Sequence, residues 1–286
     1  MSRQYKRAYE LTIIPAEGPS RVISELRVEF EITKTTLGFP NLARFNLYNP
    51  SKDTLAAIQR KFTKVIFKAG YEDNVLLLFK GEIRNVFQSK TSVDRIINFY
   101  AGDGERDWQN SSFNKTFSSN VPISSAIKEV ISTFKNTTVG ALEGLPEIAD
   151  KLRGQTLSGS SKTILDNFAN EYGFEWSIQD NEIEITPKDQ PLEGEQVVVL
   201  NSATGMIGSP TITELGADVS TLLNPILKPN RAFKIESSPA NIGIGNLFFR
   251  DINKTSAEGI YKIYEVTFKG DLYENNWLSN VKGRYI

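Results

Sequence analysis

The sequence contains no cysteine and no histidine. Without cysteine the chain cannot form disulfides or thiolate metal sites. Without histidine it lacks the commonest general base and the commonest metal ligand, which excludes both Ser-His-Asp and Cys-His catalysis. Long apolar runs are absent too, since none approaches the roughly 20 residues of a membrane-spanning helix. The apolar stretch near the N-terminus is too short for a secretory signal, so we expect folding in the cytoplasm and no stable membrane association.

The composition is that of an ordinary globular protein of more than one domain. The chain has 286 residues, of which 40% are apolar and 23% charged, and its net charge is −1. The charge is unevenly distributed, with a basic excess in residues 1–106, an acidic excess in 107–195 and near balance in 196–286. We therefore predict three domains with these boundaries.

Residues 1–106 have the alternation of β-strands. The clearest case is residues 26–33, where apolar and polar side chains alternate, so that one face is buried and the other is wet. Further strands are expected over residues 9–13, 43–47, 65–71, 75–87 and 95–101, with a short helix over 55–62.

Residues 107–195 change to helical spacing. Apolar residues recur at helical intervals over 122–134 and over 160–173, and the second helix is expected to end at Gly173. Residues 174–185 predict a β-hairpin that turns at Asp180-Asn181. The Gly-, Ser- and Thr-rich stretch 136–159 is expected to be an irregular exposed loop. Together these elements predict a small α+β insert.

The third segment is organised around residues 202–229. Gly205, Gly208 and Pro210 predict a turn cluster that ends the preceding element. Two short strands over 211–215 and 217–223 follow, and Asn224-Pro225 closes the unit. Other strands are expected over 197–200, 232–236, 261–266 and 281–286, with a flexible loop at 242–245. The strand at 261–266 has no purely polar face, so we expect it to have a partner on both sides.

Paired carboxylates in the insert are the main candidates for catalysis. Glu182 and Glu184 share a face of the hairpin, and Glu171 and Glu175 flank the helix exit. Paired carboxylates serve glycoside hydrolysis, but nothing in the sequence supplies a second, distinct carboxyl to act as the acid. Glutamate alternating with isoleucine is typical of a solvated face. We therefore predict no catalytic residue.

No motif for a metal or a cofactor is present either. Asp180-Asn181-Glu182 is too short for a calcium-binding loop and lacks its closing glutamate. Gly243-Ile244-Gly245 lacks the third glycine of a phosphate-binding loop. We predict no metal site and no cofactor.

Several motifs, in their order and spacing, resemble the baseplate hub proteins of long-tailed bacteriophages. In the third segment the residues that carry this resemblance are Gly205, Gly208 and Pro210, then Leu223, Asn224 and Pro225, then Gly270, Asp271 and Trp277. In the first segment they lie in FKAGY, with Gly70 and Tyr71, in LFKGEI, with Gly81, and in AGDGERDW, which ends at Trp108. These positions are candidates for structural or interface roles.

The resemblance implies a fold and a set of partners. It implies a mainly β protein in which two tail-tube-like β-barrel or sandwich domains flank the small α+β insert. A homotrimeric ring would join the hexameric tail tube to the central spike, in contact with other baseplate proteins and the tape measure protein, and DNA would pass through its lumen. The protein would reside in the virion, in the tail baseplate, after assembly in the bacterial cytoplasm. A bacteriocin or another contractile injection device would show the same pattern.

Two other function classes stay open. The ten tyrosines and three tryptophans would suit a glycan-binding β-sandwich of a tail or cell surface, although most aromatic residues occupy alternating inward positions. A cell-wall hydrolase is disfavoured by the absence of histidine and of a convincing carboxylate pair. A hub, a lectin and a hydrolase differ in oligomeric state, glycan binding and wall-lytic activity.

Overall fold

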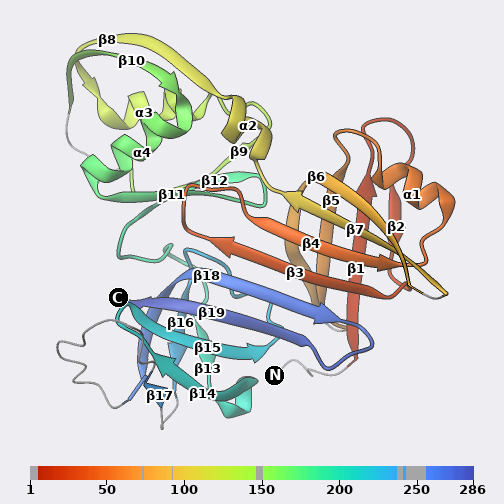
Figure 1. Ribbon diagram of the computed structural model, residues 1–286. Coiled ribbons are helices and arrows are strands. Elements are labelled where there is room, and N and C mark those ends of the chain that lie inside the picture. Colours follow the sequence, from red (N-terminus) through yellow and green to blue (C-terminus); the bar gives the residue numbers. More distant parts are fainter. Residues whose placement is uncertain (1–5, 73, 92, 146–150, 237–240, 243–255) are drawn as a thin grey trace.

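The body of the protein is one long curved sheet built from both ends of the sequence (Figure 1). The computed structural model describes residues 6–72, 74–91, 93–145, 151–236, 241–242 and 256–286. The middle of the sequence forms a small α+β module at one end of the body. The mainly β class expected from the sequence is confirmed. Among the helices of the described residues, none is long and apolar enough to cross a membrane.

The first part of the chain contributes seven strands and one short helix. The strands are β1 (Arg7–Ile14), β2 (Arg21–Ile23), β3 (Val28–Thr35), β4 (Leu42–Tyr48), β5 (Lys64–Tyr71), β6 (Asn74–Thr91) and β7 (Asp94–Gly102). Helix α1 (Lys52–Ile58) begins after Ser51, whose hydroxyl accepts a hydrogen bond from the Thr54 N–H. All six strands predicted in residues 9–101 are present, and so is the predicted helix.

The last part of the chain contributes seven more strands and one 3₁₀ turn. The strands are β13 (Val198–Leu200), β14 (Met206–Ile212), β15 (Gly216–Leu222), β16 (Ala232–Ile235), β17 (Asn241–Ile242), β18 (Gly259–Asp271) and β19 (Trp277–Tyr285), and the turn is η1 (Ser202–Thr204). The expected loop at 242–245 lies outside the described residues after Ile242.

Strand β18 joins the two parts. It pairs with β19 on one side and with β3 on the other, in register from Glu265 opposite Thr35 to Asp271 opposite Glu29. The result is a single 14-stranded sheet, and one hydrophobic core contains side chains from both parts. The consecutive residues 261–263 are all buried, so both faces of β18 are covered there, as its lack of a polar face predicted. The two β-rich segments therefore share one sheet and one core.

The module has its own secondary structure and its own core. Its elements are α2 (Glu105–Asn110), β8 (Ser112–Pro122), α3 (Ile123–Ile131), β9 (Thr138–Leu142), β10 (Lys151–Ser160), α4 (Ser161–Tyr172), β11 (Phe174–Gln179) and β12 (Glu182–Pro187). The two predicted helices and the hairpin are confirmed, and Gly173 ends α4 in the left-handed region at φ +73°. The apolar stripes of α3 and α4 pack in a second core, separate from that of the large sheet.

The expected exposed loop at 136–159 is wrong. Residues of this stretch form β9, which pairs in parallel with β12, and most of β10, which pairs antiparallel with β8. Most side chains of the β8–β10 ribbon are exposed. Only a few apolar side chains, such as Phe117 and Leu152, are buried against the helices. Such a ribbon shows little hydrophobic alternation, because its strands bury so few side chains.

The predicted turn cluster at Gly205, Gly208 and Pro210 is only partly correct. Gly205 ends η1 at φ +98°, but Gly208 and Pro210 lie within β14. The register of β14 against β15 shifts between Ile207 and Thr211, so the intervening residues form a bulge. A bulge tolerates proline and a left-handed glycine inside a strand.

Candidate functional site

The first and last parts of the chain meet around Trp277, which is 2% exposed. Its indole Nε1–H donates a hydrogen bond to the main-chain carbonyl of Gly70, 3.2 Å away. Its ring lies edge-on to Phe30, with centroids 5.4 Å apart. Gly270 leaves room for both rings, since a Cβ there would lie 2.4 Å from the Phe30 ring. The structure therefore brings together three of the motif residues, from opposite ends of the sequence.

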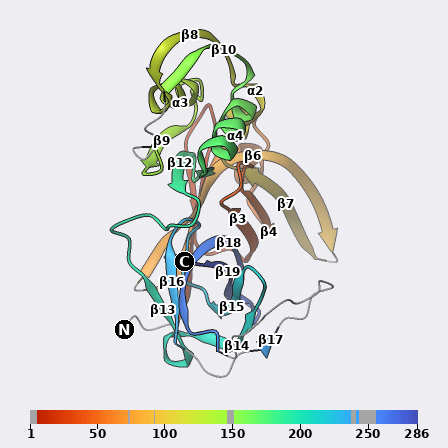
Figure 2. The same ribbon diagram turned by 90° about the vertical axis from the view of Figure 1, so that its left-hand side faces the viewer.

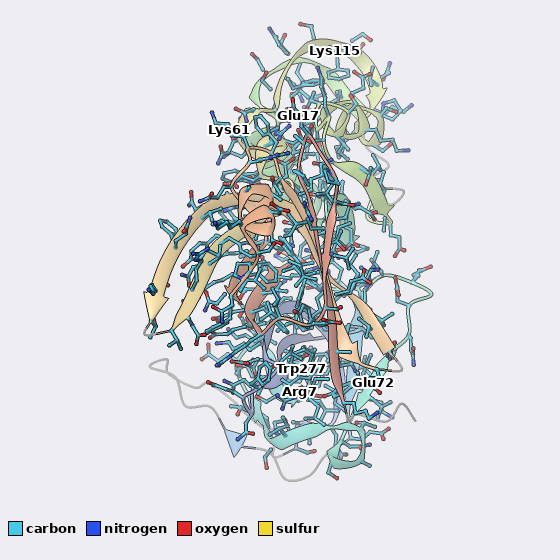
Figure 3. The ribbon with its side chains drawn as sticks, turned by 90° about the vertical axis from the view of Figure 1, so that its right-hand side faces the viewer. Arg7, Glu17, Lys61, Glu72, Lys115 and Trp277 are labelled. Atoms are coloured by element: carbon cyan, nitrogen blue, oxygen red, sulfur yellow. The ribbon has the colours of Figure 1, made fainter. Side chains whose placement is uncertain are left out.

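Two arginines hold the turn between β18 and β19 against the first part. Arg27 forms an ion pair with Asp271 at 2.6 Å, and the Asp271 side chain is almost fully buried. The guanidinium of Arg7 lies 5.6 Å from the centre of the Trp277 ring and donates to the Asp271 carbonyl at 2.9 Å. Figure 3 shows Arg7 beside Trp277. Asp271 thus links the β18–β19 turn to the first part of the chain.

A buried polar network joins the module to the first part of the sheet. Both carboxylate oxygens of Asp103 accept hydrogen bonds, from the main-chain N–H and the side-chain amide of Asn41 at 2.7 and 2.8 Å and from the Asp180 N–H at 2.9 Å. Lys34, 1% exposed, forms an ion pair with the Asp180 carboxylate at 2.5 Å. Burial raises the pKa of Asp103 to about 6, although Lys34 and the Asn41 hydrogen bonds act in the opposite direction.

The expected solvated face of the hairpin is wrong for Glu184. Glu182 is exposed, but Glu184 is 7% exposed. Its carboxylate accepts hydrogen bonds from Arg231 at 3.0 Å and from the Asn230 amide at 2.9 Å. The hairpin packs against the loop before β16, and this tertiary contact covers a face that would be wet in an isolated module.

A second buried cation links the module to β18. The ammonium of Lys262, 1% exposed, contacts the Glu175 carboxylate at 3.0 Å and donates to the Thr186 hydroxyl and the Pro187 carbonyl at 3.1 and 2.8 Å. Burial lowers the pKa of Lys262, and the Glu175 carboxylate counteracts this shift. Glu175 also pairs with Arg284 of β19. The module is therefore held by ion pairs on both parts of the sheet.

The charged groups between the module and the sheet are paired with one another. Asp180, Glu184 and Glu175 each form an ion pair with a lysine or an arginine. Within the described ranges, no three His, Cys, Asp or Glu side chains gather closely enough to hold a metal ion. Buried ion pairs contribute little net stability but are costly to break, so they define how the module sits on the sheet.

The other motif residues also lie mostly inside the protein. Leu223 is 1% exposed, Tyr71 and Pro225 are buried, and the Asn224 N–H donates to the Ser279 hydroxyl at 3.0 Å. A Cβ on Gly81 would lie 2.4 Å from the Gly102 carbonyl, so this glycine allows β6 and β7 to approach. Their positions account for roles in the fold.

Trp108 and Gly208 lie nearer the surface. The half-buried Trp108 donates from its indole to the Gly38 carbonyl at 2.6 Å, and the Lys162 ammonium lies 3.2 Å from its ring centre. This tryptophan attaches the β3–β4 turn to the module. Gly208 is exposed in the β14 bulge.

Sequence reasoning missed the buried charges. The burial of Lys34 could have been predicted from the sequence, because this residue continues the inward positions of Val28, Phe30 and Ile32 along β3. A lysine at an inward position of a strand predicts a buried partner. No comparable pattern predicts the burial of Asp103 and Lys262, since it depends on contact between the module and the sheet.

The known proteins that this chain resembles are components of phage tails and of a related secretion system. A family model described as "Baseplate hub gp41" matches residues 40–241, which run from before β4 to the start of β17. No curated protein sequence gives a match.

Several solved structures share the fold. The 43 kDa tail protein of prophage MuSo2 from Shewanella oneidensis has a TM-score of 0.66 at 9% identity, over 97% of this chain and 98% of that one. A tail protein from Neisseria meningitidis has a TM-score of 0.63 at 9% identity, over 98% and 97%. An Escherichia coli component of the type VI secretion system, described as similar to the T4 tail proteins gp27 and gp5, has a TM-score of 0.60 at 11% identity, over 96% and 76%.

Proposed function

Because the chain belongs to the baseplate hub gp41 family, we propose that three copies form a ring that joins the hexameric tail tube to the central spike. A baseplate hub is a structural component of the phage tail, and therefore of the virion. We propose assembly of the ring in the bacterial cytoplasm, contacts with other baseplate proteins, and passage of the tape measure protein and DNA through its lumen. The same architecture would serve a bacteriocin or another contractile injection device.

The observation that carries this proposal is the continuous sheet across β3 and β18. We propose that residues 1–106 and 196–286 act as two tube-like units, with residues 107–195 between them. Three chains would then present six units to a six-fold tube. The core contact of Trp277 with Gly70 and Phe30 supports this, because it holds the two units in one fixed relation.

The exposed face of the sheet suits a channel that DNA passes without being held. Lysines on this face are matched by carboxylates on the neighbouring strand, as Lys269 is by Glu31 and Lys282 is by Glu265, both at 2.8 Å. Tight non-specific binding of DNA requires clusters of free cations that release counterions from the phosphates. A face whose lysines are paired in this way offers DNA few such cations.

No specific observation favours the glycan-binding or hydrolase alternatives. Trp176 and Trp277 are 3% and 2% exposed, and the indole N–H of the half-buried Trp108 already has a partner in the protein. The hairpin carboxylates Glu175 and Glu184 are engaged by cations. We therefore propose that the protein is not an enzyme and needs no cofactor.

The test is the mass in solution by light scattering, for the protein alone and mixed with its tube protein. The chain has a mass of 32.0 kDa, so the proposal predicts a particle of three times that mass and a larger complex with tube protein. A strict monomer that ignores tube protein at high concentration would contradict it. Glycan arrays and a cell-wall clearing assay test the alternatives.

A further inference from the structure

Beyond β5, the outer edge of β6 has no neighbouring strand among the described residues. The hairpin that this part of β6 forms with β7, residues 83–98, is here called the arm; on its other side β7 remains paired with β4 as far as Ile96. Strand β5 pairs with β6 only as far as Glu82, and the Ile83 N–H donates to the Thr63 carbonyl at 2.8 Å, so β6 pairs with β7 alone from Asn85 to Thr91. Figure 2 shows the arm curving away from the body. No described segment of the chain therefore pairs with the outer edge of β6 along the arm. Natural proteins seldom leave so long an edge open, because it can pair with another chain.

The arm also exposes apolar side chains. Phe87 is 57% exposed and touches Tyr100 edge-on with centroids 6.3 Å apart, and Val93 near the tip is 87% exposed. An edge strand with open hydrogen-bonding groups and exposed apolar side chains is a surface that another chain can cover. Such an arm gains stability from a surface that it covers.

The charged residues near the tip of the arm indicate the charge of the surface that it would cover. Lys90 and Arg95 are directly opposite each other, so they lie on the same face of the arm. Like charges in this position destabilise a hairpin. In the described part of the chain neither side chain forms an ion pair. The arm therefore presents two free cations to an acidic partner.

The module of the same protein is acidic. Residues 107–195 carry an acidic excess, and five exposed carboxylates there take part in no ion pair with described residues: Asp166, Glu171, Glu182, Asp189 and Glu193. In both Figure 1 and Figure 2 the tip of the arm points away from the module of its own chain. Contact between the basic arm and an acidic module thus requires two chains.

We propose that the arm binds the module of a second copy of this chain, with Lys90 and Arg95 against its carboxylates and with Phe87 and Val93 covered. This inference rests on the proposed ring and names the contact that closes it. A cyclic arrangement satisfies the contact in every copy, since each chain supplies one arm and one module.

The first test compares two matched double variants by light scattering over a concentration series. Lys90→Glu with Arg95→Glu should raise the concentration at which the ring dissociates at least tenfold. Lys61→Glu with Lys64→Glu makes the same charge change at exposed lysines of the same unit and should leave the ring unchanged. Both variants should unfold at the wild-type temperature, because all four side chains are exposed.

The second test locates the contact. Because the chain has no cysteine, Val93→Cys provides a single attachment site for a thiol-linked photo-crosslinker. Mixed isotope-labelled and unlabelled copies should yield crosslinks between chains, with the partner peptide in residues 107–195.

The outcomes separate the two proposals. A trimer that the arm variant leaves intact, or crosslinks that reach only the tube protein or residues outside the module, would overturn the arm contact and leave the hub function standing. A wild-type protein that stays monomeric with and without tube protein would overturn both.

Discussion

The indole N–H of Trp277 and the carbonyl of Gly70 form a hydrogen bond of 3.2 Å between residues 207 positions apart in the sequence. Trp277 belongs to the last strand and Gly70 to β5 of the first part, so this bond crosses the junction of the two units. The relation of the two units thus depends on a few interior contacts, which substitutions can probe one at a time.

Trp277→Phe should destabilise the protein by about 1–3 kcal/mol. Phenylalanine keeps an aromatic contact with Phe30 but removes the donor to the buried Gly70 carbonyl. Trp277→Ala should cost more, about 3–5 kcal/mol, because it also leaves a cavity. Urea unfolding measures both. Tyr273→Phe is the control, since Tyr273 is 72% exposed and its change should stay within about 0.5 kcal/mol.

Gly270→Ala should destabilise the protein by about 1–3 kcal/mol through overpacking. The new methyl would meet the Phe30 ring at 2.4 Å and the Trp277 ring at 2.7 Å. Combining it with Phe30→Leu opens space, so the double variant should lose less stability than the sum of the two single variants. Strict additivity in this cycle would show that the methyl is accommodated elsewhere.

Lys262→Met should destabilise the protein by about 3–5 kcal/mol, because it breaks a buried ion pair and leaves the Pro187 and Lys188 carbonyls without their donor. Lys234→Met is a matched control. Its ammonium also pairs with a glutamate, Glu236 at 2.6 Å, but both side chains are exposed and the cost should be below about 1 kcal/mol. Equal effects from the two substitutions would contradict the inference that Lys262 holds the module on the sheet.

Asp103 should make stability depend on pH in a defined direction. Its pKa of about 6 in the folded protein exceeds the ordinary value of 3.8, so the folded state holds the proton more tightly than the unfolded state. The stability from this group is fully present below pH 3.8 and is lost as pH rises through 6. The loss amounts to roughly 3 kcal/mol.

Asp103→Asn isolates this contribution, because asparagine does not titrate. The difference in unfolding free energy between wild type and variant, measured by urea titration at several pH values, should shift against the wild type between pH 4 and 6.5. A difference that is constant over this range, or that moves in favour of the wild type, would show that the hydrogen bonds from Asn41 and Asp180 outweigh burial.

Much of the secondary structure followed from local patterns. Alternation over 26–33 predicted β3, helical spacing with Gly173 predicted α4 and its end, and Asp180-Asn181 predicted the hairpin turn, where both residues have positive φ. The β8–β10 ribbon did not follow, because it buries too few side chains to produce a pattern. The bulge in β14 did not follow either, because its glycine and proline look like a turn until the pairing with β15 is known.

The sequence by itself determined the β class of this protein, most strands and helices, and the exclusion of histidine and cysteine chemistry, because these depend on residue type and on spacing within one segment. Only the tertiary structure decided that β18 pairs with β3, that Glu184 is buried against Arg231, and that Lys34, Asp103 and Lys262 are interior groups. These features depend on surfaces from distant segments meeting, and the burial of a charge is a property of both surfaces together.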